Sequence, residues 1–362
     1  MPKSRSSIAP DARVFHTLDL LRGFAAICVV AFHMGATFAP GGYLAVDLFF
    51  MMSGVVLSHA YEARFRAGMG TIDFMRLRFI RLYPLYLLGT LFGIAVTVAS
   101  LLGRNSVHWD AVSLLRAALL QLFFLPNLAT SPVDSLFPLN IPCWSLFLEI
   151  LINLLFVMCW RWLSSRRLVA LCLLAAGVVA WGVVQVGNMD QGSTVATFAI
   201  GFARTVFGFF VGVLIARHIP RVQKAASNLI VLAVTASVGI AIAGSPHADL
   251  RVAWDVACVL LVFPVVVYFA TLVNPDARLT GVATFLGVTS YAVYVLHSPL
   301  TSVLNSMSRH LGGGGQGTSI VVLAGLLVVL LAGCWVVDRI IDAPVRRYLA
   351  RVIPRMRKSS TG

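Results

Sequence analysis

The sequence predicts an all-α protein, a polytopic transmembrane helical bundle of about ten spans. Of its 362 residues, 59% are hydrophobic and only 12% are charged, whereas roughly 25% of the residues in a soluble domain are charged. The apolar residues also gather in long runs, each near the ~20 residues that a helix needs to cross a bilayer. Finally, the basic residues fall between these runs, so the bilayer is the expected surrounding of most of the chain.

The predicted spans follow one another through the chain with short connections. A weaker run at 110–125 is more amphipathic, and we expect it to be interfacial or re-entrant. The ten runs lie at 18–38, 43–61, 79–102, 144–162, 168–187, 195–216, 228–244, 252–273, 282–304 and 318–341.

The distribution of Lys and Arg predicts the orientation, because basic loops stay in the cytoplasm. We expect a basic cytoplasmic segment at 1–17, one membrane domain at 18–344 and a basic cytoplasmic tail at 345–362, with no appended soluble domain. Both termini are then cytoplasmic, and a glycine-rich loop at 312–315 lies outside. The first run has no small-residue cleavage site, so it is expected to remain as a helix.

The net charge of +14 does not indicate nucleic-acid binding, because the basic residues do not share one face. It is explained by topology, with a preference for anionic lipid or an anionic cofactor. The six cysteines form no C-x-x-C pair, so neither a disulfide framework nor a metal site is expected.

Ionisable residues inside the spans are candidates for function, since each costs about 2.5–3.5 kcal/mol on insertion scales. Arg22 and His33 are eleven residues apart in the first run, which places them on one helix face roughly 16 Å apart. A snorkelling helix end is the alternative for Arg22, and a buried structural histidine is the alternative for His33.

Two further groups of polar residues flank the second and third runs. Asp47 stands at the outer end of the second run, where it favours a helix start, and Ser53 and Gly54 also suit close helix packing. Arg76, Arg78 and Arg81 open the third run from the cytoplasmic side; guanidinium groups suit phosphate, although positive-inside anchoring explains them equally.

The last groups lie in the fourth and ninth runs. Ser145 and Glu149 are spaced i,i+4, and Ser290, Tyr294 and His297 are spaced i, i+4 and i+7, so each group shares one helix face. On the predicted topology Glu149 and His297, with His33 and Asp47, lie in the outer half of the membrane. The arginines lie at the inner boundary, which predicts two polar layers joined by a channel.

These motifs resemble the acyltransferase-3 family of membrane-bound O-acyltransferases, which modify exopolysaccharide, lipopolysaccharide, Nod factors and macrolides. The resemblance covers about residues 15–350. Glu149 is followed by Ile150, where members often carry a second carboxylate, and the acidic-Pro signature is present as Asp342-Ala-Pro344. The motifs are Leu18-Asp-Leu-Leu-Arg22-Gly with His33, Val46-Asp47-Leu-Phe-Phe with Ser53-Gly54, Arg78-Phe-Ile-Arg81-Leu-Tyr-Pro84, Trp144-Ser-Leu with Glu149, and Ser290-Tyr291 with Tyr294 and His297.

The resemblance implies transfer of an acyl group, with acetyl the commonest, from cytoplasmic acyl-CoA to a hydroxyl of a sugar or glycoconjugate. It implies a multi-pass protein of the bacterial inner membrane and no metal. His33 would be the general base or acyl carrier, assisted by Glu149 and Arg22. Glu149 would orient or charge-stabilise the imidazole, or protonate the leaving thiolate. CoA would bind Arg78, Arg81 and Arg76, and the substrate would contact Asp47, Ser290, Tyr294 and His297.

Other functions remain open at this point. A secondary transporter also lines a path with intramembrane charges, but it usually shows repeats or broken helices, which this sequence does not. A macrolide or other small molecule is an alternative acceptor, and a receptor or scaffold would need neither the Arg22 and His33 face nor the cytoplasmic arginines.

Overall fold

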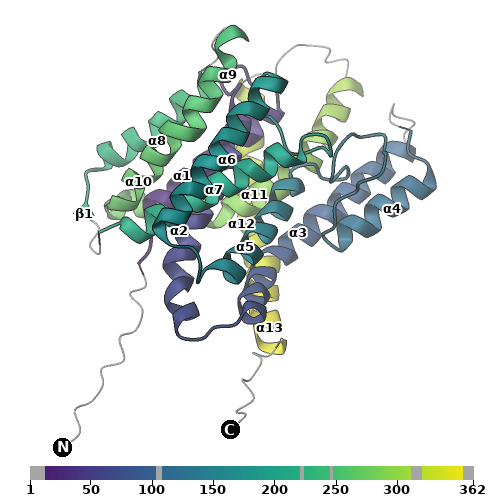
Figure 1. Cartoon of the computed structure of the whole chain (residues 1–362). Helices are drawn as coiled ribbons and strands as arrows, with labels where there is room; N and C mark the ends of the chain where they lie inside the picture. Colours follow the sequence, from purple (N-terminus) through teal and green to yellow (C-terminus); the bar gives the residue numbers. More distant parts are fainter. Residues whose placement is uncertain (1–12, 103–107, 221–223, 245–247, 311–319, 354–362) are drawn as a thin grey trace, which may run out of the picture.

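The computed structural model describes residues 13–102, 108–220, 224–244, 248–310 and 320–353, and these are mostly helical (Figure 1). The all-α prediction is therefore confirmed. The predicted segment 1–17 is described only from residue 13 and the tail 345–362 only to residue 353; the glycine-rich loop 312–315 lies outside the described residues. The cytoplasmic placement of both termini stays a prediction.

The elements follow one another in this order: α1 (His16–His33), a short 3-10 turn (Gly42–Leu44), α2 (Ala45–Arg66), α3 (Thr71–Leu102), α4 (Ala111–Leu122), α5 (Cys143–Cys159), α6 (Ser165–Val186), α7 (Phe198–His218), β1 (Lys224–Ala225), α8 (Asn228–Ala243), α9 (Ala248–Ala257), α10 (Phe263–Leu272), β2 (Val273–Asn274), α11 (Ala277–His310), α12 (Ile320–Val337) and α13 (Ala343–Val352). The two short strands pair in parallel, with Lys224 opposite Val273.

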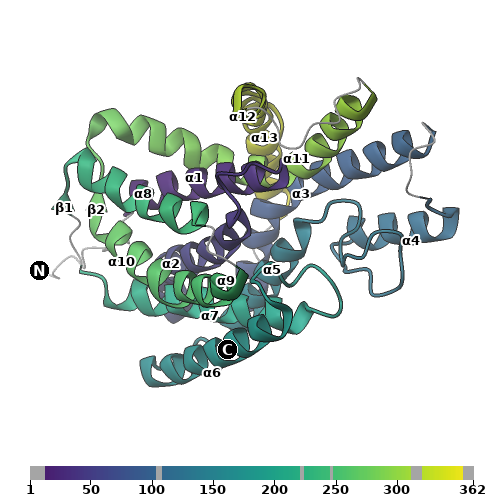
Figure 2. The same cartoon turned by 90° about the horizontal axis from the view of Figure 1, so that it is seen from above.

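Eight helices in the described ranges are long and apolar enough to cross a membrane. The shorter α5 and α8, of 17 and 16 residues, occupy the two remaining predicted runs, so the multi-pass architecture agrees with the sequence. The weak run at 110–125 forms α4, whose 12 residues are too few to span. Figure 2 shows α3 and α4 projecting on one side of the bundle and α8 and α10 lying on the other.

α4 begins at a polar cap rather than inside an apolar run. Asp110 is its N-cap, and its carboxylate accepts a hydrogen bond from the Ser113 amide at 2.9 Å. Hydrogen bonds from the hydroxyl and amide of Ser113 lower the pKa of the Asp110 carboxyl. The residue just before this cap, Trp109, lines a cavity together with residues of α3.

Two spans contain a wide turn immediately before a proline. π-Helical turns occupy Cys258–Val262 and Asp338–Asp342, and each is followed two residues later by Pro264 or Pro344. Proline lacks an N–H and its ring clashes with the carbonyl four residues earlier. The wider i→i+5 turn relieves this clash without breaking the span.

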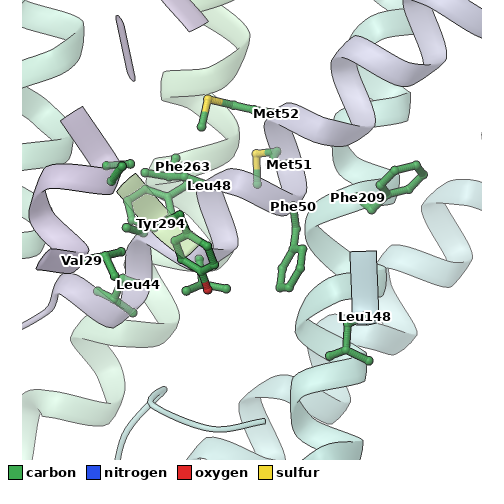
Figure 3. Packing of buried hydrophobic residues seen from close by; sticks show 14 of the residues in the cluster. Val29, Leu44, Leu48, Phe50, Met51, Met52, Leu148, Phe209, Phe263 and Tyr294 are labelled. Atoms are coloured by element: carbon green, nitrogen blue, oxygen red, sulfur yellow. The ribbon is translucent and has the colours of Figure 1, made fainter. Parts of the chain in front are cut away.

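Glycines let the central helices approach closely. α2 and α7 run in the same direction, and a Cβ at Gly54 would overlap the carbonyl oxygen of Phe209, while one at Gly212 would overlap that of Met51. This is the small-residue packing expected between membrane helices. Figure 3 shows Val29 and Phe263 to one side of α2 and Phe209 and Leu148 to the other, so α2 is surrounded by apolar contacts.

The closeness of α2 and α7 predicts a sharp difference between two glycine variants. Gly54→Ala should destabilise the protein by about 1–3 kcal/mol because the new methyl group overpacks the contact with Phe209. Gly177→Ala in α6 is the control, since a Cβ there meets nothing within 4 Å. Thermal unfolding of the detergent-solubilised variants measures the effect; equal midpoints for the two would contradict the close-packing account.

Candidate active site

A cavity of about 180 Å³ lies between α1, α2, α3, α5 and α11. Its apolar walls come mainly from α2, while its polar groups come from all five helices. The cavity therefore brings together side chains that are up to 272 residues apart in the chain, from Arg22 to Tyr294. Its polar lining consists of Arg22, Ser53, Arg78, Arg81, Ser145, Glu149, Ser290, Tyr291 and Tyr294.

An ion pair between α3 and α5 forms one wall of the cavity. Arg78 Nη2 lies 2.9 Å from Glu149 Oε1, and the Ser53 hydroxyl donates to the same oxygen at 3.0 Å. The predicted separation of these residues into an inner and an outer layer is therefore wrong. The reason is that α3 begins at Thr71, eight residues before the apolar run, so Arg78 lies two turns inside the helix.

The other arginines of the site have different surroundings. Arg81 stacks on the ring of Tyr291 at 5.6 Å and lies 3.7 Å from Asp342, while its side chain remains 38% exposed. Arg22 pairs with Asp19 at 3.1 Å. Arg76, also predicted to bind the cofactor, donates to the carbonyl of Ile353 at the end of α13.

Tyr294 closes the end of the cavity opposite the arginines. Its hydroxyl lies 2.7 Å from the hydroxyl of Ser145. Its ring packs on Phe49 with the centroids 5.4 Å apart and on the imidazole of His297 at 5.9 Å. Because His297 lies one helical turn beyond, Tyr294 joins the cavity to the next polar group along α11.

Two histidines meet beyond Tyr294. The rings of His33 and His297 are 5.0 Å apart at their centroids; His33 is exposed and His297 is fully buried. The Nδ1 atoms lie 2.9 Å from the carbonyl of Val29 and 2.8 Å from that of Tyr294, respectively.

These contacts define the tautomers. A carbonyl oxygen only accepts, so each Nδ1 carries the proton and each neutral imidazole keeps its lone pair on Nε2. The buried Nε2 of His297 has no hydrogen-bond partner among the described residues. His33 thus presents a basic nitrogen near the bundle surface, with a second histidine behind it.

Residues 15–339 match a family described as an acyltransferase domain. The chain belongs to this acyltransferase family. It is also 35% identical over 184 residues to a Rhizobium radiobacter protein named protein 2 in picA locus, which covers 48% of this chain and 95% of the relative. No solved structure matches the chain. Membership of an acyltransferase family decides against the transporter alternative.

Asp47 of the acyltransferase lies in the first turn of α2, as predicted, and its carboxylate is paired with another helix. Its carboxylate is fully buried and forms a two-pronged ion pair with Arg204 of α7, at 3.0 Å from Nε and 2.6 Å from Nη2. Arg204 also lies over the ring of Trp144 at 5.8 Å. The carboxylate is thus occupied by Arg204, and the geometry favours a structural clamp between α2 and α7 over the predicted substrate contact.

Several paired residues of the acyltransferase were not singled out in the sequence. Arg204 lies in the middle of the predicted span 195–216. It therefore meets the criterion that made His33 a candidate, an ionisable residue inside a span. Asp255 has two such partners: the hydroxyl of Tyr43 donates to its carboxylate at 2.7 Å, and Arg251 lies 3.2 Å from the same carboxylate. Among the described residues, no group of three His, Cys, Asp or Glu side chains could hold a metal.

The clamp predicts how Asp47 variants behave. Asp47→Asn leaves Arg204 buried without its counter-charge and should cost about 3–5 kcal/mol of stability, whereas replacing Arg204 with Met in the same chain should recover much of that loss. Unfolding midpoints of both single variants and the double variant measure the coupling. An Asp47→Asn protein of normal stability that has lost only activity would instead support the substrate contact.

Proposed function

We propose that this acyltransferase moves an acyl group, with acetyl expected, from cytoplasmic acyl-CoA to a hydroxyl of a sugar or glycoconjugate at the outer half of the bacterial inner membrane. The observation that carries the proposal is the arrangement of the cavity. Arginines line one end of it, and at the other end Tyr294 leads to the pair of histidines.

The arginine end suits the donor. CoA carries several phosphate charges, and guanidinium groups bind phosphate with paired hydrogen bonds. Of the three arginines that line the cavity, Arg81 has the most exposed side chain, at 38%, whereas the side chain of Arg78 is only 12% exposed. We therefore assign the phosphates to Arg81, and we assign to Glu149 the role of holding Arg78 toward the cavity.

The histidine end suits the chemistry of acyl transfer. The lone pair of His33 Nε2 can take the proton from the acceptor hydroxyl as its oxygen attacks the thioester carbonyl. The new C–O bond forms, the C–S bond breaks, and the CoA thiolate leaves and takes up the proton. A covalent acyl-imidazole on the same nitrogen would use the same geometry in two steps.

Two neighbouring groups would support this base. His297 lies against the His33 ring. Its free Nε2 can accept a hydrogen bond from the acceptor hydroxyl, or from His33 Nε2 after that nitrogen has taken up the proton. The hydroxyl of Tyr294 lies beside Ser145 and donates to the Pro142 carbonyl at 3.3 Å; turned from that long hydrogen bond, it can donate to the developing oxyanion. Arg22, paired with Asp19 at the cavity wall, adds positive charge along the path of the acyl group.

A histidine exchange tests the role of His33. His33→Ala should lower acyl transfer by about 10²–10⁴-fold, the range for loss of a general base. The matched control is His218→Ala, because His218 is also exposed at a helix end with Nδ1 2.8 Å from the carbonyl four residues earlier. Radiolabelled acetyl-CoA and de-acylated envelope polysaccharide provide the assay in membranes; normal transfer by His33→Ala would overturn the mechanism.

An arginine exchange tests the donor end. Arg81→Gln should raise the KM for acetyl-CoA about tenfold or more, because a charge-assisted phosphate contact contributes about 1.5–3 kcal/mol. Arg64→Gln is the control, since Arg64 likewise stacks on a tyrosine, Tyr61, at 5.1 Å but lies outside the cavity. Equal KM values for both variants would remove Arg81 from the donor site.

A further inference from the structure

A second cavity, of about 210 Å³, opens beyond the first along α3 and α11. Its third wall is the segment that leads into α5, around residues 133–141. None of the residues predicted to bind substrate lines this cavity. Its characteristic lining residues are Gly93, Thr97, Trp109, Asn140, Ser298 and Ser302.

The lining of the second cavity is uncharged throughout, in contrast to the arginine-rich first cavity. Hydroxyl groups come from both helices, an amide comes from Asn140, and the ring of Trp109 supplies a broad apolar surface. An anionic ligand such as CoA would find no counter-charge here. A neutral ligand with many hydroxyls would find hydrogen-bond partners and an aromatic ring to pack against.

Asn140 gives the second cavity a specific polar contact. The side chain is only 1% exposed, and its Nδ2 donates to the carbonyl of Val295 at 3.0 Å. Because that carbonyl can only accept, the amide orientation is determined and Oδ1 is left as a free acceptor. Oδ1 is buried and has no protein partner among the described residues. A buried acceptor left unpaired costs about 1–3 kcal/mol, which a ligand hydroxyl would offset.

The second cavity is aligned with the proposed chemistry. Tyr294, Ser298 and Ser302 are spaced i, i+4 and i+8 on α11, so they lie on one face, each about 6 Å further along the helix. Tyr294 lines the first cavity and the two serines line the second. Ser298 also directly follows His297 in the chain, so the second cavity and the histidine pair are built from the same part of α11.

We propose that the second cavity binds one sugar ring of the acceptor. The apolar face of the ring stacks on Trp109, and a ring hydroxyl donates to Asn140 Oδ1. The hydroxyls of Thr97 and Ser302 donate to carbonyls of their own helices, so they accept hydrogen bonds from further ring hydroxyls. This inference rests on the proposed function, for which it names the acceptor subsite. It assigns acceptor recognition to residues outside the first cavity.

Cysteine labelling tests the subsite without requiring acyl transfer. Ser302, exposed at the rim, is replaced by Cys, and its reaction with a membrane-impermeant maleimide is timed in spheroplasts with and without de-acylated envelope polysaccharide. Saturating polysaccharide should slow labelling at least about fivefold, since shielding follows occupancy. Thr130→Cys, exposed in the loop before α5 but outside the cavity, is the control and should be unaffected.

Variants of Trp109 test whether the slower labelling of Ser302→Cys depends on the proposed stacking of a sugar ring on Trp109. In the Ser302→Cys protein, Trp109→Ala should abolish protection and Trp109→Phe, which keeps an aromatic ring, should retain it. The parent protein corrects for its own thiols, of which Cys28, Cys143, Cys172, Cys258 and Cys334 are buried. Labelling that polysaccharide does not slow, or protection that survives Trp109→Ala, would overturn the subsite.

The two proposals fail in different ways. Protection at Ser302→Cys without any acyl transfer by the wild-type chain would support sugar binding and overturn the proposed reaction. Acyl transfer to the polysaccharide without protection would support the reaction and overturn the second cavity as the place where the sugar binds.

Discussion

The bilayer imposes the constraint on which the rest of this structure depends: a charge inside it must find its partner within the bundle. Among the described residues, five of the buried or nearly buried carboxylates illustrate this, each in an ion pair with an arginine. Three of these pairs join different helices. A fourth joins α13 to the π-helical turn that precedes it. The pairs are Asp47 with Arg204, Glu62 with Arg217, Glu149 with Arg78, Asp255 with Arg251, and Asp342 with Arg346.

Some of these ion pairs hold helices together, whereas one of them lines the candidate active site. Asp47 and Arg204 are fully buried and lie where glycines bring α2 and α7 together, so their contact fixes the two helices. Glu149 and Arg78 instead retain some exposure and line a cavity. The same requirement for pairing therefore stabilises the contact between α2 and α7 and holds Arg78 at the cavity.

Much of this arrangement could be predicted from the sequence, because helix spans and shared helix faces follow from local periodicity. Ser290 and Tyr294, which were predicted to share one helix face, line the same cavity. Arg22, which was predicted at the inner boundary, lines it together with Glu149, which was predicted in the outer half. Partners on other helices could not be predicted in this way. The pairing of Glu149 with Arg78 depends on α3 beginning before its apolar run, which the sequence pattern did not indicate. Arg204 was detectable as a charge within a span, but its pairing with Asp47 requires the packing of α2 on α7.

The central claim is that donor and acceptor enter from opposite faces of the bundle and meet at the histidine pair. Sealed inverted membrane vesicles, with de-acylated polysaccharide trapped inside and radiolabelled acetyl-CoA added outside, test it most directly. The account predicts label on the trapped polysaccharide and none on the same polysaccharide when it is supplied outside together with acetyl-CoA. Labelling only when both substrates share the outer solution would contradict transfer through the bundle.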